Sequence, residues 1–155
     1  MKEYVGYLES AFLVKPMEKW SSSHKDRIYA QKKIYFHDTG VKTLLTGKKD
    51  FGFKVENAVF MDFVKSGIPC GYYAESDREI DFVYGNSDSP QATEAKYDTR
   101  FDWEDKRYKG VKLFLKRHPQ AKKVTIVSKS AELDFKEGKT KILVIPAWKR
   151  LIDTA

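Results

Sequence analysis

Three ionisable residues stand in two segments that otherwise read as β-strands. Asp81 lies between two apolar residues in the run EIDFVYG, and Glu94 and Lys96 flank an alanine in the run QATEAKY. Alternate residues of a strand point to the same face, so Glu94 and Lys96 share one. The polar stretch NSDSP between the two runs indicates a hairpin turn, which would bring Asp81 towards that same face.

Two carboxylates that lie close together repel each other and raise each other's pKa. A divalent cation removes this conflict, and Mg²⁺ (or Mn²⁺) prefers hard oxygen ligands from carboxylates, water and phosphate. A neighbouring lysine can orient a water molecule or stabilise charge on a phosphate. This set therefore predicts metal-assisted phosphodiester hydrolysis. The alternative is a surface ion pair between Glu94 and Lys96, which is worth only ~0–1 kcal/mol, with Asp81 accepting backbone hydrogen bonds near a turn.

The hydrophobic periodicity predicts the elements that position these residues. The expected order after residue 50 is a helix (51–67), three strands (70–75, 79–85, 91–97), a helix (about 103–118), a buried parallel strand (123–128), an irregular connection (131–139), and a strand with a short terminal helix (141–152). Such an order predicts an α/β sandwich with a mixed central sheet.

The first 50 residues read differently. They predict an amphipathic helix at 3–13, strands at 12–20 and 32–38, and a brief helix with a turn at 38–49 that ends at Gly47. The polar run SSSHKD (21–26) between the two strands is expected to be a hairpin tip or a flexible wing.

Composition narrows the functional classes. The 155 residues carry a net charge of +7, which is compatible with a polyanionic partner such as DNA. Cys70 is the single cysteine, so an intramolecular disulfide and a four-cysteine zinc site are excluded, and a reducing, cytoplasmic setting is expected. No apolar run is long enough to span a membrane. Neither GVKTLLTGKKD nor GKT has the spacing of a phosphate-binding loop, so ATP hydrolysis by this chain is not expected.

A basic helix is the expected nucleic-acid contact. The residues that would lie along a duplex backbone are Lys106, Arg107, Lys109 and Lys112. The alternative is an ordinary solvated helix face.

The pairs ID at 80–81 and EAK at 94–96 resemble the bipartite motif of the PD-(D/E)XK nuclease superfamily, which includes restriction endonucleases and Holliday-junction resolvases. The resemblance implies a restriction-endonuclease-like αβββαβ core over about residues 52–145. It also implies a further acidic residue on the preceding helix, which VENAVF supplies as Glu56. The implied catalytic set is Glu56, Asp81, Glu94 and Lys96, with Mg²⁺ or Mn²⁺ held by Asp81, Glu94 and Glu56. Ile80 departs from the proline that is usual before the aspartate.

A wider resemblance covers nearly the whole chain. The runs YLESAFLV, KIYFHDTGV, VENAVFMDF, REIDFV and EAKY resemble the C-terminal region of a family of prokaryotic predicted AAA+-type ATPases. In that family an ATPase module precedes a winged-helix segment and a nuclease-like domain of unknown function. The resemblance implies that residues 1–47 are the end of the winged helix, residues 48–155 are the nuclease-like domain, and the ATPase module is absent from this chain.

Two functions are therefore expected. One is a metal-dependent DNA endonuclease or resolvase-like domain, which could act as a homodimer because nucleases of this fold often cut two strands as dimers. The other is a non-catalytic module that keeps the nuclease fold and docks DNA or a protein. The family resemblance indicates the fold more strongly than the activity.

Overall fold

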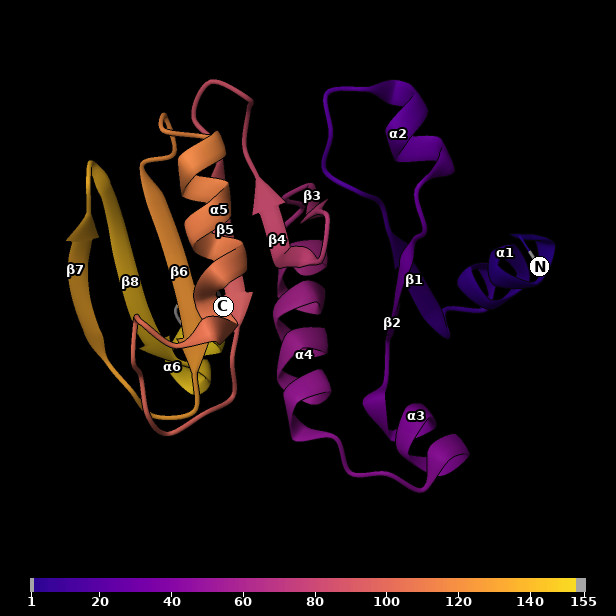
Figure 1. Ribbon diagram of the computed structural model, residues 1–155. Helices are drawn as coiled ribbons and strands as arrows, with labels where there is room; N and C mark the ends of the chain where they lie inside the picture. Colours follow the sequence, from indigo (N-terminus) through magenta and orange to yellow (C-terminus); the bar gives the residue numbers. More distant parts are fainter. Residues whose placement is uncertain (1, 153–155) are drawn as a thin grey trace.

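The computed structural model describes residues 2–152 and contains a large mixed sheet with a smaller two-stranded sheet beside it (Figure 1). The helices are α1 (Lys2–Ser10), α2 (His24–Tyr29), α3 (Thr39–Thr46), α4 (Phe51–Lys65), the 3₁₀ turn η1 (Lys106–Tyr108), α5 (Lys109–Arg117) and α6 (Ala147–Ile152). The strands are β1 (Val14–Met17), β2 (Lys33–Phe36), β3 (Cys70–Glu75), β4 (Arg78–Tyr84), β5 (Gln91–Ala95), β6 (Lys123–Ser128), β7 (Leu133–Glu137) and β8 (Thr140–Pro146).

The six-stranded sheet has the order β3-β4-β5-β6-β8-β7. Its centre is parallel, because β6 pairs in parallel with both β5 and β8, and the outer pairs are antiparallel. The expected mixed central sheet flanked by helices is therefore confirmed, and so is the parallel placement of residues 123–128.

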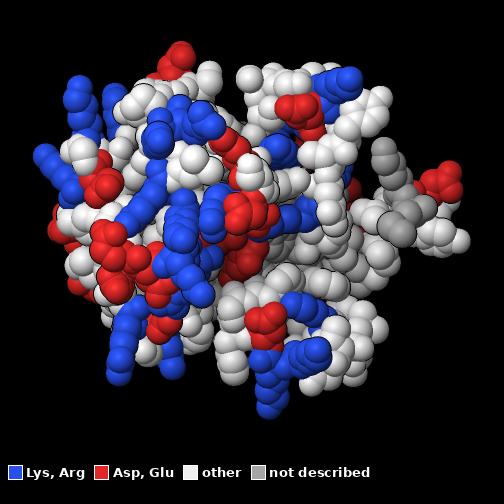
Figure 2. Space-filling model, in the orientation of Figure 1, with Lys and Arg blue, Asp and Glu red and all other residues white. Residues whose placement is uncertain are grey.

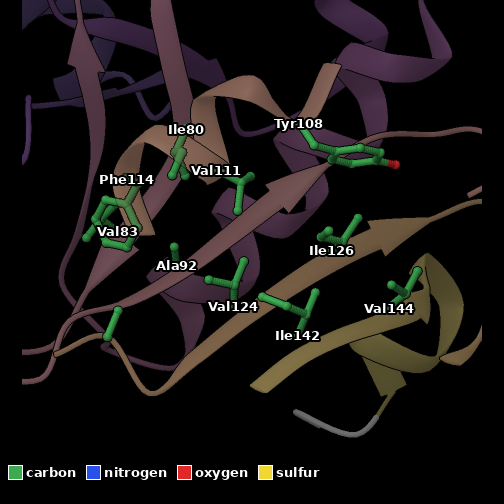
Figure 3. Close-up of a cluster of buried hydrophobic side chains, with 11 residues drawn as sticks. Ile80, Val83, Ala92, Tyr108, Val111, Phe114, Val124, Ile126, Ile142 and Val144 are labelled. Atoms are coloured by element: carbon green, nitrogen blue, oxygen red, sulfur yellow. The ribbon is translucent and has the colours of Figure 1, made fainter. Parts of the chain in front are cut away.

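Two hydrophobic clusters hold the helices against the sheet. One joins Val111 and Phe114 of α5 to strand residues such as Ile80, Val124 and Ile142 (Figure 3). The other joins α4 and α6 to the sheet and to β1–β2, and contains Met17, Tyr35, Val59, Phe60, Phe63, Tyr72, Phe82, Val127 and Ala147. The apolar stripe predicted for residues 51–67 supplies the α4 members of this second cluster.

A register shift interrupts β4 next to Asp81. Gly71 pairs with Val83 and Tyr73 pairs with Ile80, so two residues of β4 stand opposite Tyr72 alone. This arrangement is a β-bulge, in which an extra residue disturbs the alternation of side chains along the strand. Ile80 and Phe82 would share a face in a regular strand, yet they belong to different hydrophobic clusters.

The first part of the chain is attached to the edge of the large sheet. The Trp20 amide donates to the Tyr72 carbonyl over 2.7 Å, and the Tyr72 amide donates to the Glu18 carbonyl over 3.2 Å. A Cβ atom on Gly71 would lie 2.7 Å from the Glu18 carbonyl oxygen, so this close approach requires glycine. Met17 and Tyr35 share a cluster with α4, and the domain division at 47/48 stays a prediction.

Three of the expected elements differ in part from the structure. The run 21–26 lies between the antiparallel strands β1 and β2, as expected of a hairpin connection, but it is not flexible loop throughout, because α2 begins within it and the Ser23 hydroxyl accepts the Asp26 amide at 3.2 Å as an N-cap. The helix expected from residue 103 begins later, at η1, because the Asp102 and Asp105 side chains accept nearby backbone amides and hold the preceding chain in turns.

The third correction concerns residues 131–139, which are not an irregular connection. Residues 133–137 form β7, an edge strand that pairs antiparallel with β8. Gly138 has φ of 58°, which permits the tight turn between β7 and β8.

None of the helices formed by residues 2–152 is long and apolar enough to cross a membrane.

Candidate active site

Asp81 and Glu94 lie where β4 and β5 stop pairing. The last backbone pair of these strands is Phe82 with Thr93. Beyond it, the Asp81 amide donates to Glu94 Oε2 over 3.0 Å, and the Ala95 amide donates to Asp81 Oδ2 over 2.9 Å. The two carboxylates therefore replace backbone carbonyls as acceptors at the end of the ladder, and both side chains are buried.

Lys96 follows the end of β5 and contacts Glu94. Its Nζ lies 2.5 Å from Glu94 Oε1, and its amide donates to the Val127 carbonyl of β6 over 2.8 Å. The backbone of Lys96 is thus held by the neighbouring strand while its ammonium group neutralises a buried carboxylate. The expected proximity of Asp81, Glu94 and Lys96 is present in the structure.

Glu56 reaches the same region from α4, but an ammonium group lies between it and Asp81. Lys33 Nζ is 3.2 Å from Glu56 Oε1 and 3.3 Å from Asp81 Oδ1. The Tyr35 hydroxyl donates to the same Glu56 oxygen over 2.7 Å. Glu56 therefore belongs to the polar cluster through Lys33 and Tyr35, which both come from β2.

Sequence reasoning did not find Lys33 and Tyr35. Lys33 also contacts Glu79 Oε1 at 2.6 Å, so one ammonium group joins three carboxylates from α4 and β4. The sequence signal was only their alternation within KIYF, which places them on one face of a strand. Nothing in that spacing links β2 to residues 56, 79 or 81, because the link depends on tertiary packing.

Burial and charge alter the acid–base properties of the cluster. Desolvation and the neighbouring Asp81 raise the pKa of Glu94 above its usual value, despite the opposing attraction of Lys96. Desolvation lowers the pKa of Lys96, but attraction to Glu94 and Asp81 outweighs it and the net pKa is raised. The pKa of Lys33 is likewise raised, because Asp81, Glu56 and Glu79 outweigh the desolvation. Both lysines are thus kept protonated.

The carboxylate oxygens of this cluster are of the ligand type that hard divalent cations prefer. Lys33 Nζ already lies within 3.3 Å of one oxygen from Glu56 and one from Asp81, so a positive centre fits between these carboxylates. In the described part of the chain, no three His, Cys, Asp or Glu side chains converge, as they lie, in a way that could hold a metal ion. Three-carboxylate coordination would therefore require the side chains to rearrange.

The four basic residues expected to contact nucleic acid near α5 fall into two pairs, one held in ion pairs and one exposed. Arg107 forms ion pairs with Asp98 and Asp105, and Lys112 Nζ lies 2.7 Å from Glu104 Oε2. Lys106 and Lys109 are exposed. Figure 2 shows Lys and Arg side chains gathered over α5, beside a group of Asp and Glu side chains between α5 and the β1–β2 sheet.

Comparison with known proteins gives one match. A family model described as a domain of unknown function (DUF8612) matches residues 1–51. No curated protein and no solved structure matches the chain. The matched segment ends at the first residue of α4, so it contains Lys33 and Tyr35, whereas Glu56, Asp81, Glu94 and Lys96 lie outside it.

Proposed function

We propose that this chain carries a PD-(D/E)XK nuclease-like domain that hydrolyses DNA phosphodiester bonds with a divalent metal ion. The observation that carries the proposal is the buried Asp81–Glu94 pair at the end of β4 and β5, with Lys96 Nζ 2.5 Å from Glu94. The order α4-β3-β4-β5-α5-β6 supports a restriction-endonuclease-like core. The β1–β2 pair and its flanking helices support the assignment of residues 1–47 to the end of a winged-helix segment.

In this proposal the acidic side chains bind the metal ion. Asp81 and Glu94 are the main ligands, and Glu56 joins them from α4. Bound Mg²⁺ or Mn²⁺ would polarise a phosphate oxygen and lower the pKa of a coordinated water molecule. Burial strengthens the attraction of the ionised Asp81 and Glu94 carboxylates for a cation, and because the pKa of Glu94 is raised, a cation bound there would displace its proton.

Lys96 has a separate role. Its raised pKa keeps the ammonium group charged at neutral pH, and its side chain is 28% exposed. A substrate phosphate can therefore approach it. We assign Lys96 to stabilising the negative charge that develops on the phosphate in the transition state. The exposed Lys106 and Lys109 would contact the DNA backbone near the site without reading sequence.

DNA cleavage tests this function. Supercoiled, linear, flapped and four-way-junction DNA are incubated with the protein in Mg²⁺ or Mn²⁺, and in parallel with a chelator. We expect slow, metal-dependent cleavage that Asp81→Asn abolishes. No cleavage of any substrate, or equal cleavage by wild type and Asp81→Asn, would contradict the proposal.

A second candidate is a docking module without catalysis, in which the first 51 residues bind another protein such as an ATPase module. The observation that favours it is the number of large apolar side chains exposed on α1 and α3 and beside them. These are Tyr4, Tyr7, Phe12, Leu44 and Leu45, each at least 69% exposed. Exposed apolar side chains that adjoin one another are typical of interaction sites, and Leu44 and Leu45 are neighbours on α3.

Sedimentation equilibrium tests whether the docking partner is a second copy of this chain. If the apolar surface pairs two copies of the chain, the wild type should dimerise and Leu44→Ser with Leu45→Ser should be monomeric. Negligible DNA binding at low salt, together with no cleavage, would favour a docking role over the nuclease.

A further inference from the structure

We propose that Lys33, on β2, is a tethered counter-cation that competes with the divalent metal ion for Asp81 and Glu56. This inference rests on the metal-binding part of the proposed function. It gives a residue outside the proposed ligand set a role in how tightly the site binds metal.

The contacts of Lys33 carry the argument. Its Nζ lies within 2.6–3.3 Å of oxygens from Glu79, Glu56 and Asp81. Two of these three residues, Glu56 and Asp81, are also proposed metal ligands. The Lys33 side chain is only 23% exposed, so its charge is poorly screened by solvent. The ammonium group thus holds the position that a cation shared by these two carboxylates would take.

An ammonium group and a small divalent ion cannot use the same oxygens together. Magnesium–oxygen bonds are about 2.0–2.1 Å long, shorter than the contacts that Lys33 makes. The carboxylates would therefore have to close around the metal ion while Lys33 moves away. Glu79 is 47% exposed and is not a proposed ligand, so it can retain the ammonium group after displacement.

The hairpin is fixed next to Glu56 by bonds that do not involve Lys33. The Asn57 side chain accepts the Phe36 amide and donates to the Phe36 carbonyl, both over 2.8 Å. Tyr35 is buried and its hydroxyl donates to Glu56. These bonds hold the backbone of β2 against α4. The Lys33 side chain, and not the strand, is therefore the part that would move when a metal ion displaces the ammonium group.

Titration calorimetry with Mn²⁺ tests the competition. Lys33→Met removes the charge and keeps most of the side-chain stem. The matched control is Lys32→Met, which makes the same charge change one residue away, where Lys32 pairs with Glu18. We expect Lys33→Met to bind Mn²⁺ roughly tenfold or more tighter than the wild type and Lys32→Met, because a competing unit charge is removed. Equal or weaker binding by Lys33→Met, or no Mn²⁺ binding by any of the three proteins, would overturn the inference.

A second measurement uses the wild type and does not depend on how the variants fold. Acetylation of individual lysines is followed by mass spectrometry with and without saturating Mn²⁺. We expect Mn²⁺ to increase the acetylation rate of Lys33 and to leave Lys32 unchanged. An unchanged rate at Lys33 would overturn the inference.

The two proposals can fail separately. If Lys33→Met and Lys32→Met have equal affinity for Mn²⁺, the proposal that Lys33 competes with the metal ion is wrong and the nuclease proposal stands. If Lys33→Met binds Mn²⁺ more tightly but no protein cleaves DNA, the competition stands and the nuclease proposal fails.

Discussion

The Asp81 amide donates a hydrogen bond to Glu94 Oε2 over 3.0 Å, at the point where the backbone ladder between β4 and β5 ends. Each carboxylate uses one oxygen to accept a backbone amide and the other to contact a lysine. Asp81 Oδ1 contacts Lys33, and Glu94 Oε1 contacts Lys96. One lysine comes from the segment before α4 and the other from the large sheet, so the site is assembled from both.

The first prediction concerns pH. The pKa of Glu94 is raised in the folded protein, so its contribution to stability is greatest below its usual value of 4.5 and is lost as the pH rises towards the raised value. Glu94→Gln has no such ionisation. We expect the melting temperature of Glu94→Gln minus that of wild type to increase as the pH rises from 5 to 8, because only the wild type loses stability through Glu94 over this range. Each kcal/mol of stability that the wild type loses should increase this difference by roughly 2–4 °C.

The control for this measurement is Glu3→Gln, which alters an exposed glutamate on α1. Its melting temperature should follow that of the wild type across the same range. A constant difference between Glu94→Gln and wild type from pH 5 to pH 8 would show that burial does not perturb Glu94.

The second prediction concerns the packing of α5 on β4. A Cβ atom at Gly110 would lie 2.2 Å from the Glu79 carbonyl oxygen, which is backbone and cannot move alone. Gly110→Ala should therefore destabilise the protein by about 1–3 kcal/mol or more through overpacking. Urea unfolding measures the change. Gly6→Ala is the matched control, because nothing lies within 4 Å of its Cβ position in α1, and it should stabilise by about 0.5–1 kcal/mol. Equal stability of the two variants would contradict the close approach of α5 to β4.

The third prediction concerns DNA. Lys106 and Lys109 are exposed, whereas Arg107 and Lys112 are held in ion pairs with acidic side chains. We expect the affinity for duplex DNA to fall steeply with salt. Lys106→Ala with Lys109→Ala should reduce the log–log slope by about 0.9 for each phosphate that the protein no longer neutralises. Fluorescence anisotropy over a salt series gives the slope.

Lys136→Ala with Lys139→Ala is the control pair, because both residues are exposed, on β7 and in the turn before β8, and the pair removes the same charge. An equal reduction by both pairs would indicate a general charge effect and would argue against a DNA contact at Lys106 and Lys109.

Part of this site could be read from the sequence because it depends on local periodicity. Asp81, Glu94 and Lys96 stand on strands joined by a short turn, and their mutual contacts follow from strand geometry. The helix α4 and the parallel strand β6 were equally readable from their apolar patterns.

Other features depend on tertiary structure and gave no local signal. The bulge opposite Tyr72 arises from a register shift that no residue type marks. Lys33 is distant from Asp81 in sequence and meets it through the packing of β2 against α4, which includes the hydrogen bonds of Asn57. Strand β7 was missed because its side chains are mostly exposed, so it carries no apolar alternation and its pairing with β8 defines it.

The most direct test of the central claim is the single-turnover cleavage rate of Lys96→Ala, measured together with its Mn²⁺ affinity. Because Lys96 is assigned to transition-state charge and its ammonium group contacts the proposed ligand Glu94, we expect Mn²⁺ affinity equal to or tighter than that of wild type and a cleavage rate lower by roughly 10²–10³-fold. Asp81→Ala should lose both, and Lys122→Ala, at an exposed lysine away from the carboxylates, should lose neither. A Lys96→Ala protein that cleaves DNA at the wild-type rate would contradict the assignment of Asp81, Glu94 and Lys96 as a nuclease site.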